Sequence, residues 1–306
     1  MNFSILIGGL QFIKYVFSYR FLASVIFLFS SHILAAQELH LDPALVKGPD
    51  ACGECHKDTM ALWKETKHST TFTNLPRAEE ARDIANKMDI KRIKSGSDCL
   101  SCHFTSAIVA EKTQPIAGIT CESCHGAGQD WIDVHSDFGG KDVKAENEEP
   151  AHKKERYAKS EQAGMLRPGH LYELAQNCYG CHTVPNEKLV NVGGHTAGSK
   201  FELVRWSQGE VRHNVWYTKE NDESAIERRR MMFIVGQMLD LEYAMRGLAV
   251  ATEKADYAKA MTRRAQSAKL RIQKIAEKVE AKELGEITEV ASAVKLKLNN
   301  EQALLE

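Results

Sequence analysis

Residues 121–128, CESCHGAG, contain two cysteines separated by two residues, and a histidine directly follows the second cysteine. Taken alone, this pattern fits a pair of zinc ligands, a redox-active dithiol or the attachment site of a haem. The rest of the chain decides among the three, because the same pattern recurs. Three more copies are present: CGECH at 52–56, CLSCH at 99–103 and CYGCH at 178–182.

All eight cysteines belong to these four motifs, and a histidine follows every pair. A disulfide framework or zinc ribbons would leave the four histidines without a role. A thioredoxin-like motif is expected once, within an alternation of strands and helices that this chain lacks. Haem c uses every residue, because two thiols form thioethers with the porphyrin and the histidine ligates the iron. We therefore expect four covalently bound haem c groups with iron, attached through Cys52 and Cys55, Cys99 and Cys102, Cys121 and Cys124, and Cys178 and Cys181.

The histidines divide into proximal and distal candidates. The proximal ligands are the motif histidines, which are His56, His103, His125 and His182. Methionine is the alternative distal ligand, but nothing separates Met60, Met88 and Met165 from ordinary core residues, so we expect mostly bis-histidine haems of low potential. The distal candidates are His68, His135, His170, His195 and His213.

The surroundings of these candidates differ. Two glycines precede His195, which allows the backbone to approach a flat ring closely. His135 follows the third motif so soon that we expect it to close a different haem. His170 is either a distal ligand or a residue at a helix start. His152 lies in a charge-dense stretch and is interpreted as a surface histidine.

Around these motifs the chain resembles the tetrahaem cytochrome c554 family, whose best-known members accept electrons from hydroxylamine oxidoreductase. The resemblance covers about residues 50–183, and its most specific part is GITCESCHGAGQDWIDVH at 118–135. It also rests on CGECHKDTMALWKETKHSTTFTNLPR at 52–77, on DCLSCH at 98–103 and on the fourth CYGCH.

The resemblance implies distal ligands at His68 and His135, and a third just before the fourth motif, where His170 is the nearest match. It further implies one five-coordinate iron, at CLSCH. This chain departs from the family after the fourth motif, and either His195 or His213 could ligate the iron that the family leaves open.

The N-terminal segment has the features of an export signal. Lys14 and Arg20 precede an apolar stretch that ends in small residues near Ala36, and the first acidic residue is Glu38. We expect cleavage near Ala36 and a periplasmic protein with no stable membrane span, the alternative being a retained anchor. Removal of the two basic residues changes the net charge from −1 to −3. Neither this charge nor any basic or glycine-rich motif indicates nucleic-acid binding.

The predicted fold is mainly α-helical, with little regular sheet and a core built of haems. We expect a signal peptide at 1–36, a tetrahaem domain at 37–220 and a C-terminal helical segment at 221–306. In that last segment apolar residues recur at helical spacing from Met231 to Leu248, again from Tyr257 to Val279, and again after Gly285. This pattern predicts a helical hairpin or small bundle that covers the haems, forms an oligomer or docks a partner.

Three functions fit these observations. The first is a carrier that moves electrons between donor and acceptor proteins through closely packed haems. The second is an enzyme that reduces a small nitrogen or sulfur oxide at one open iron. The third is an electron-transfer subunit of a larger redox complex. Whether the chain is an enzyme is left open by the sequence, and the carrier is favoured.

Overall fold

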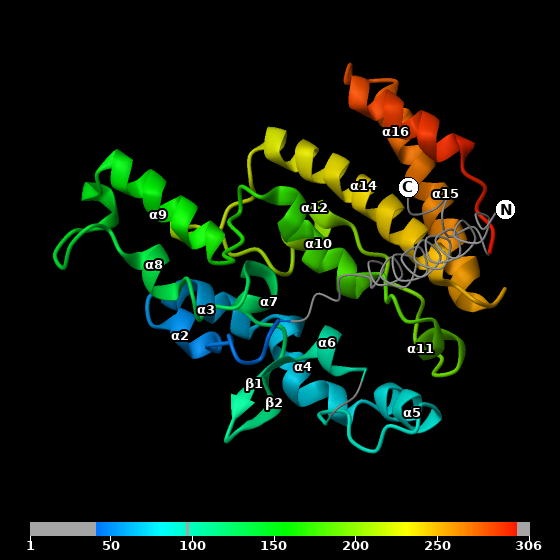
Figure 1. Ribbon diagram of the computed structural model, residues 1–306, viewed down its shortest axis with the longest axis horizontal. Coiled ribbons are helices and arrows are strands. Elements are labelled where there is room, and N and C mark those ends of the chain that lie inside the picture. The colour runs from blue at the N-terminus through cyan, green and yellow to red at the C-terminus, as the bar shows by residue number, and fades with distance from the viewer. Residues whose placement is uncertain (1–40, 96–97, 299–306) are drawn as a thin grey trace, which may run out of the picture. The chain divides into compact units, whose positions relative to one another are not determined.

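The computed structural model describes residues 41–95 and 98–298 (Figure 1). The predicted signal segment at 1–36 lies outside the described residues. Short helices and one hairpin make up the first part of the described chain. Their bounds are α2 Pro49–Gly53, α3 Lys57–Lys64, α4 Lys67–Asn74, the 3-10 turn η1 Leu75–Arg77, α5 Glu79–Lys87, α6 Leu100–His103, β1 Thr105–Val109, β2 Lys112–Ala117, α7 Cys121–His125 and α8 Ile132–Ser136.

Longer helices follow. Their bounds are the 3-10 turn η2 Ala145–Asn147, α9 Pro150–Gln162, α10 Leu171–His182, α11 Glu187–Asn191, α12 Leu203–Ser207, α13 Val215–Thr218, α14 Ile226–Val250, α15 Asp256–Ala276 and α16 Lys282–Ala293. The prediction of a mainly helical fold with little regular sheet is confirmed. Strands β1 and β2 form an antiparallel hairpin whose register runs from Thr105 opposite Ala117 to Val109 opposite Lys112.

The C-terminal helices contain the largest apolar core of the described residues. Helix α14 packs along α15 and also against α10 and α12, as Figure 1 shows. A side chain at Gly247 would meet the Tyr257 hydroxyl and Met261, so the glycine allows α14 and α15 to approach closely. Tyr257, Met261 and Ile272 line the buried face of α15. The haem-motif helix α10 therefore rests on the C-terminal hairpin.

Helix α14 covers the first apolar run predicted for this segment, α15 covers the second only as far as Ala276 and not to Val279, and the third run also differs. The sequence places a break at Gly285, whereas α16 begins at Lys282 and includes the glycine. Burial of Leu284 against α14 and α15 anchors this first turn, and this packing outweighs the low helix propensity of glycine.

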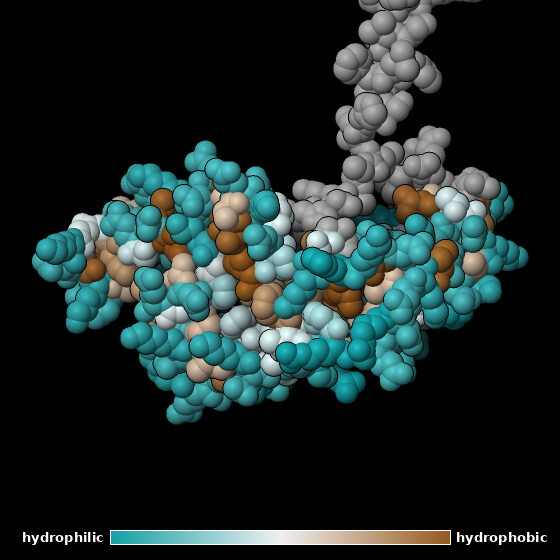
Figure 2. Space-filling model, turned by 90° about the horizontal axis from the view of Figure 1, so that it is seen from below, coloured by the Kyte–Doolittle hydropathy of each residue, from teal (hydrophilic) through white to brown (hydrophobic). Residues whose placement is uncertain are grey.

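The haem-motif half has few fully buried apolar side chains in the described residues. Ala85, Ile93 and Phe104 form a small buried cluster in this half, and Trp131 is buried at the start of α8. No helix among the described residues has the length and apolar character needed to cross a membrane. Figure 2 shows apolar side chains exposed in separate patches between hydrophilic ones on the face it presents.

Candidate haem-binding site

Each motif is wound on a helical turn that brings its cysteines and histidine together. The amide of His56 donates to the Cys52 carbonyl at 3.0 Å, and that of His103 donates to the Cys99 carbonyl at 3.1 Å. The third motif is helix α7 itself, which begins after a Thr120–Ser123 capping box. The fourth motif forms the last turns of α10. All eight cysteines are free of disulfides.

The motif histidines lie beside four of the five distal candidates, one to each. The ring centroids of His56 and His135 are 6.3 Å apart, and those of His68 and His182 are 6.2 Å apart. The remaining pairs are His103 with His195 at 6.4 Å, and His125 with His213 at 6.2 Å.

These separations can be compared with the distance between the centroids of two imidazoles that both ligate one metal ion. Bonds of about 2.0–2.1 Å from each histidine nitrogen to a first-row metal place the two nitrogens about 4 Å apart. Each ring centroid lies roughly 1.1 Å beyond its nitrogen, so the centroids should be about 6.3 Å apart. All four pairs have centroid separations close to this value. The residues therefore fit a haem iron between the histidines of each pair.

The protonation states of these histidines also suit metal binding. Burial is the main cause that lowers the pKa of His103 and of His182 to about 4, and the neighbouring histidines add to the shift. Burial likewise lowers the pKa of His56, His68 and His125. These imidazoles are neutral at pH 7, and a neutral ring has the lone pair that a metal requires.

Several of these rings are oriented by hydrogen bonds at Nδ1, which leaves Nε2 for a metal. The Nδ1 atom of His125 lies 2.8 Å from the Leu166 carbonyl. Backbone carbonyls also accept from Nδ1 of three distal histidines: His135 to Ile132, His195 to Thr196 and His213 to Val211. The partner of His182 Nδ1 differs, because it is the Ser199 hydroxyl at 3.0 Å.

Helix α7, which is the third motif, and the residues beside it are hydrogen-bonded to segments next to each of the other three motifs. The buried carboxylate of Glu122 accepts from the amides of Lys47 and Gly48, just before the first motif, at 2.9 and 2.8 Å, and from Gly128 at 2.7 Å. The Ser123 hydroxyl lies 2.9 Å from that of Thr105, which follows the second motif. Asn177, beside the fourth motif, donates to the Cys124 carbonyl at 2.8 Å.

Contacts between cysteines also show which motifs lie next to one another. A hydrogen bond between the thiols of Cys52 and Cys121 raises the pKa of the first and lowers that of the second. A second such bond joins Cys102 and Cys181, lowering the pKa of Cys102 and raising that of Cys181. Burial raises the pKa of Cys124 to about 11. The first motif thus adjoins the third, and the second adjoins the fourth.

The remaining sequence candidates lie apart from the pairs. His170 caps the start of α10 and its Nε2 lies 3.7 Å from a Glu161 carboxylate oxygen. His152 contacts the Glu148 carboxylate at 2.8 Å through Nδ1. Met60 and Met88 are buried and take no part in a histidine pair. Glu122 and Ser199 were not singled out from the sequence, because nothing in their local pattern distinguishes them from surface residues.

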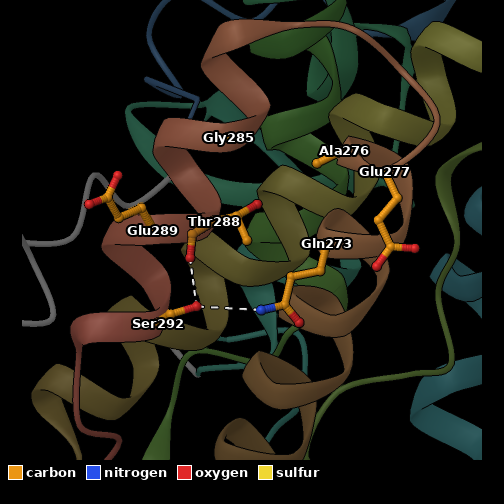
Figure 3. Close-up of a pocket in the computed structure, with 7 residues that line it drawn as sticks. All are labelled: Gln273, Ala276, Glu277, Gly285, Thr288, Glu289 and Ser292. Carbon is orange, nitrogen blue, oxygen red and sulfur yellow. Dashed lines mark hydrogen bonds between the residues drawn. The ribbon is translucent and has the colours of Figure 1, made fainter.

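A shallow pocket between α15 and α16 is unrelated to the motifs (Figure 3). Its polar lining includes Gln273, whose amide donates to the Ser292 hydroxyl at 3.4 Å, and Ser292 in turn donates to the Thr288 carbonyl at 2.7 Å. No group of three or more histidine, cysteine or acidic side chains in the described part of the chain could hold a metal ion. Each histidine pair supplies two donors, and a porphyrin would supply the other four.

Two cysteines on one turn, followed by a buried neutral histidine that faces a second histidine, define a c-type cytochrome with covalently bound haem. Comparison with known proteins agrees with this class. Residues 51–126, which include three of the four motifs, match the family described as cytochrome c554 and c-prime. Cytochrome c-554 of Nitrosomonas europaea is 26% identical over 158 residues, which are 49% of this chain and 62% of that relative.

Over the matched residues the chain is therefore similar to the cytochrome c554 family. It spans less than two thirds of the length of this curated relative. No solved structure matches the chain.

Proposed function

We propose that this protein is a tetrahaem c-type cytochrome of the periplasm that carries electrons between redox partners. The observation that carries the proposal is the set of four histidine pairs, each joining one motif histidine to one distal histidine at 6.2–6.4 Å. The fourth motif lies beyond the family match but has the same pairing, through His182 and His68. When bound, haem c supplies a one-electron couple.

The polypeptide's role in this proposal is to hold the four motifs close together. The thiol contacts place the first motif next to the third, and the second next to the fourth. The hydrogen bond from Asn177 to the Cys124 carbonyl joins the third to the fourth. Because the Ser123 hydroxyl also contacts that of Thr105, just after the second motif, the third motif adjoins each of the other three, and four haems held there would lie within one cluster.

The same pairs favour a carrier over a reductase. His195 faces His103, the ligand of the motif for which the family resemblance implies an open iron. An iron held between these two histidines would have no open position for a small nitrogen or sulfur oxide. Contact with a redox partner, or with a second copy of the chain, through α14, α15 and α16 is also part of the proposal.

Haem content and spin state test the proposal. The intact mass of the exported protein should correspond to four haems and cleavage near Ala36, and replacing Cys178 and Cys181 by serine should remove one haem. The oxidised protein should give only low-spin signals in electron paramagnetic resonance, and the reduced protein should bind no carbon monoxide. Rapid mixing with a second cytochrome should give electron exchange in both directions. Fewer than four haems, or an iron that binds carbon monoxide, would refute the tetrahaem bis-histidine carrier.

A further inference from the structure

The histidines of the third and fourth motifs are each held at Nδ1 and at the backbone carbonyl by one residue, but the Nδ1 partner is the Leu166 carbonyl in the third motif and the Ser199 hydroxyl in the fourth. Ser199 contacts His182 twice: its hydroxyl lies 3.0 Å from Nδ1, and its amide donates to the His182 carbonyl at 2.9 Å. A carbonyl on Nδ1 can act only as an acceptor, whereas a hydroxyl can rotate and act as donor or acceptor. The orientation of Ser199 therefore determines whether the His182 ring keeps its proton on Nδ1 and offers Nε2 to iron.

Ser199 is held in turn by the C-terminal hairpin. Arg264 of α15 donates through Nη2 to the Ser199 carbonyl at 2.8 Å. A side chain at Gly198 would come within 2.6 Å of that guanidinium nitrogen, and this residue has φ +79°. A glycine is thus required at this position both for the backbone conformation and for the approach of Arg264.

The guanidinium is itself fixed by a carboxylate from the neighbouring helix. Arg264 Nη1 donates to Asp240 of α14, and the two side chains are only 12% and 10% exposed. Burial of a charged pair costs desolvation energy, so such a pair is weak evidence for a role in stability. The second hydrogen bond of Arg264, to the Ser199 carbonyl in the loop that contacts His182, indicates a role in positioning.

We propose that Asp240 and Arg264 are positioning residues for the fourth haem: the ion pair between α14 and α15 fixes Ser199, and Ser199 fixes the ring and the Nδ1 hydrogen bond of His182. The C-terminal hairpin thereby sets the ligand field and reduction potential of one haem. This inference rests on the proposed function, because it presumes that His182 and His68 ligate one of four irons.

The direction of the effect follows from ligand chemistry. An acceptor on Nδ1 makes the imidazole a stronger donor, which stabilises ferric iron and lowers the reduction potential. Ser199→Ala removes the acceptor, so the midpoint potential of one haem should rise and one low-spin signal should shift. Ser199→Thr keeps the hydroxyl and should restore both.

Arg264→Met tests the next step. If the arginine acts through Ser199, the same low-spin signal shifts, and the double variant with Ser199→Ala differs little from Ser199→Ala alone. The control is Arg263→Met, the same change at the exposed neighbouring residue of α15, which should leave all signals unchanged. Electron paramagnetic resonance of the oxidised protein measures the low-spin signals, and a spectroelectrochemical titration measures the midpoint potentials.

The inference is overturned if Ser199→Ala leaves every signal and midpoint unchanged. It is also overturned if Arg264→Met lowers the midpoint of a haem without shifting its signal, because loss of a positive charge alone has that effect. The wild-type spectrum separates this failure from that of the proposed function. Four low-spin haems in the wild type with silent variants reject only the positioning role, whereas a missing or high-spin haem in the wild type rejects the tetrahaem proposal itself.

Discussion

The imidazole of His195 faces the imidazole of His103 at 6.4 Å, although His195 lies beyond the fourth motif and His103 belongs to the second. The loop that carries His195 rests on α5, since Gly193 lies against Met88 and Gly194 lies near the end of the Lys87 side chain. A segment after the fourth motif therefore reaches back across the chain to cover the second. In the proposed tetrahaem protein, this crossing would decide whether the iron at the second motif is open or closed.

Replacing His195 by alanine should open one iron. The oxidised variant should gain a high-spin signal, and the reduced variant should bind carbon monoxide at one haem in four, because His103 would be the sole protein ligand of that iron. His170→Ala is the matched control, as His170 lies near Glu161 rather than beside a motif histidine. A high-spin signal in the His170 variant, or none in the His195 variant, would show that the pairs are assigned incorrectly.

The glycine two residues before His195 is predicted to be needed for the same ligation. A Cβ at Gly193 would lie 2.6 Å from the Leu189 carbonyl oxygen and 3.0 Å from Met88 Cγ. Gly193→Ala should displace the loop and give a mixture of low-spin and high-spin iron, together with a loss of stability of about 1–3 kcal/mol. Gly169→Ala, where a Cβ meets nothing within 4 Å, should do neither. Spin state and thermal unfolding of the two variants provide the measurement.

The four motifs could be predicted from sequence because thioether attachment fixes their spacing. Each cysteine pair and histidine occupies five consecutive residues, so the pattern is complete before the chain folds. The C-terminal helices could also be predicted, since their apolar residues recur at helical spacing, although packing of Leu284 carries α16 through a glycine that the pattern treats as a break.

The pairing of histidines could not be derived in the same way. Which distal histidine meets which motif depends on how loops cross in space, and no local pattern records that crossing. His170 is close to the fourth motif in sequence, yet the structure brings the distant His68 to His182. Glu122 poses the same difficulty, because both Glu122 and Glu54 lie between the two cysteines of a motif, yet only Glu122 is buried.

Glu122 gives a prediction about stability. Its carboxylate accepts three backbone hydrogen bonds that join the segment before the first motif to the segment after the third. Glu122→Gln places an amide donor against one of these backbone donors, and an unsatisfied buried group costs about 1–3 kcal/mol. Thermal unfolding should therefore occur at lower temperature. The control is Glu54→Gln in the first motif. Equal unfolding temperatures of the two variants would show that the Glu122 hydrogen bonds do not stabilise the fold.

The ring planes of the pairs predict distinct magnetic signatures. The planes of His125 and His213 are 84° apart, whereas those of His56 and His135 are 25° apart. Perpendicular axial imidazoles leave two iron d orbitals nearly equal in energy and give a large maximum g value, whereas near-parallel rings give an ordinary rhombic spectrum. His213→Ala should remove the large-g signal and His135→Ala a rhombic one. The reverse assignment in low-temperature spectra would contradict the ring orientations.

The pH dependence of stability should include a contribution from Glu148. The hydrogen bond from Arg156 is the main cause that holds the pKa of this carboxyl at about 2, against its ordinary value of 4.5, and His152 adds to the shift. A carboxyl with a lowered pKa in the folded state stabilises the fold above its unfolded pKa, and this contribution is lost as the pH falls toward the folded pKa. The difference in free energy of unfolding between the wild type and Glu148→Gln should therefore be constant above about pH 5 and disappear between about pH 4.5 and about pH 2. Chemical unfolding of both proteins across this range measures it, with Glu155→Gln as the control for an exposed ion pair on α9. A gap between the wild type and Glu148→Gln that does not change with pH would show that Glu148 stabilises the fold by packing and not by its charge.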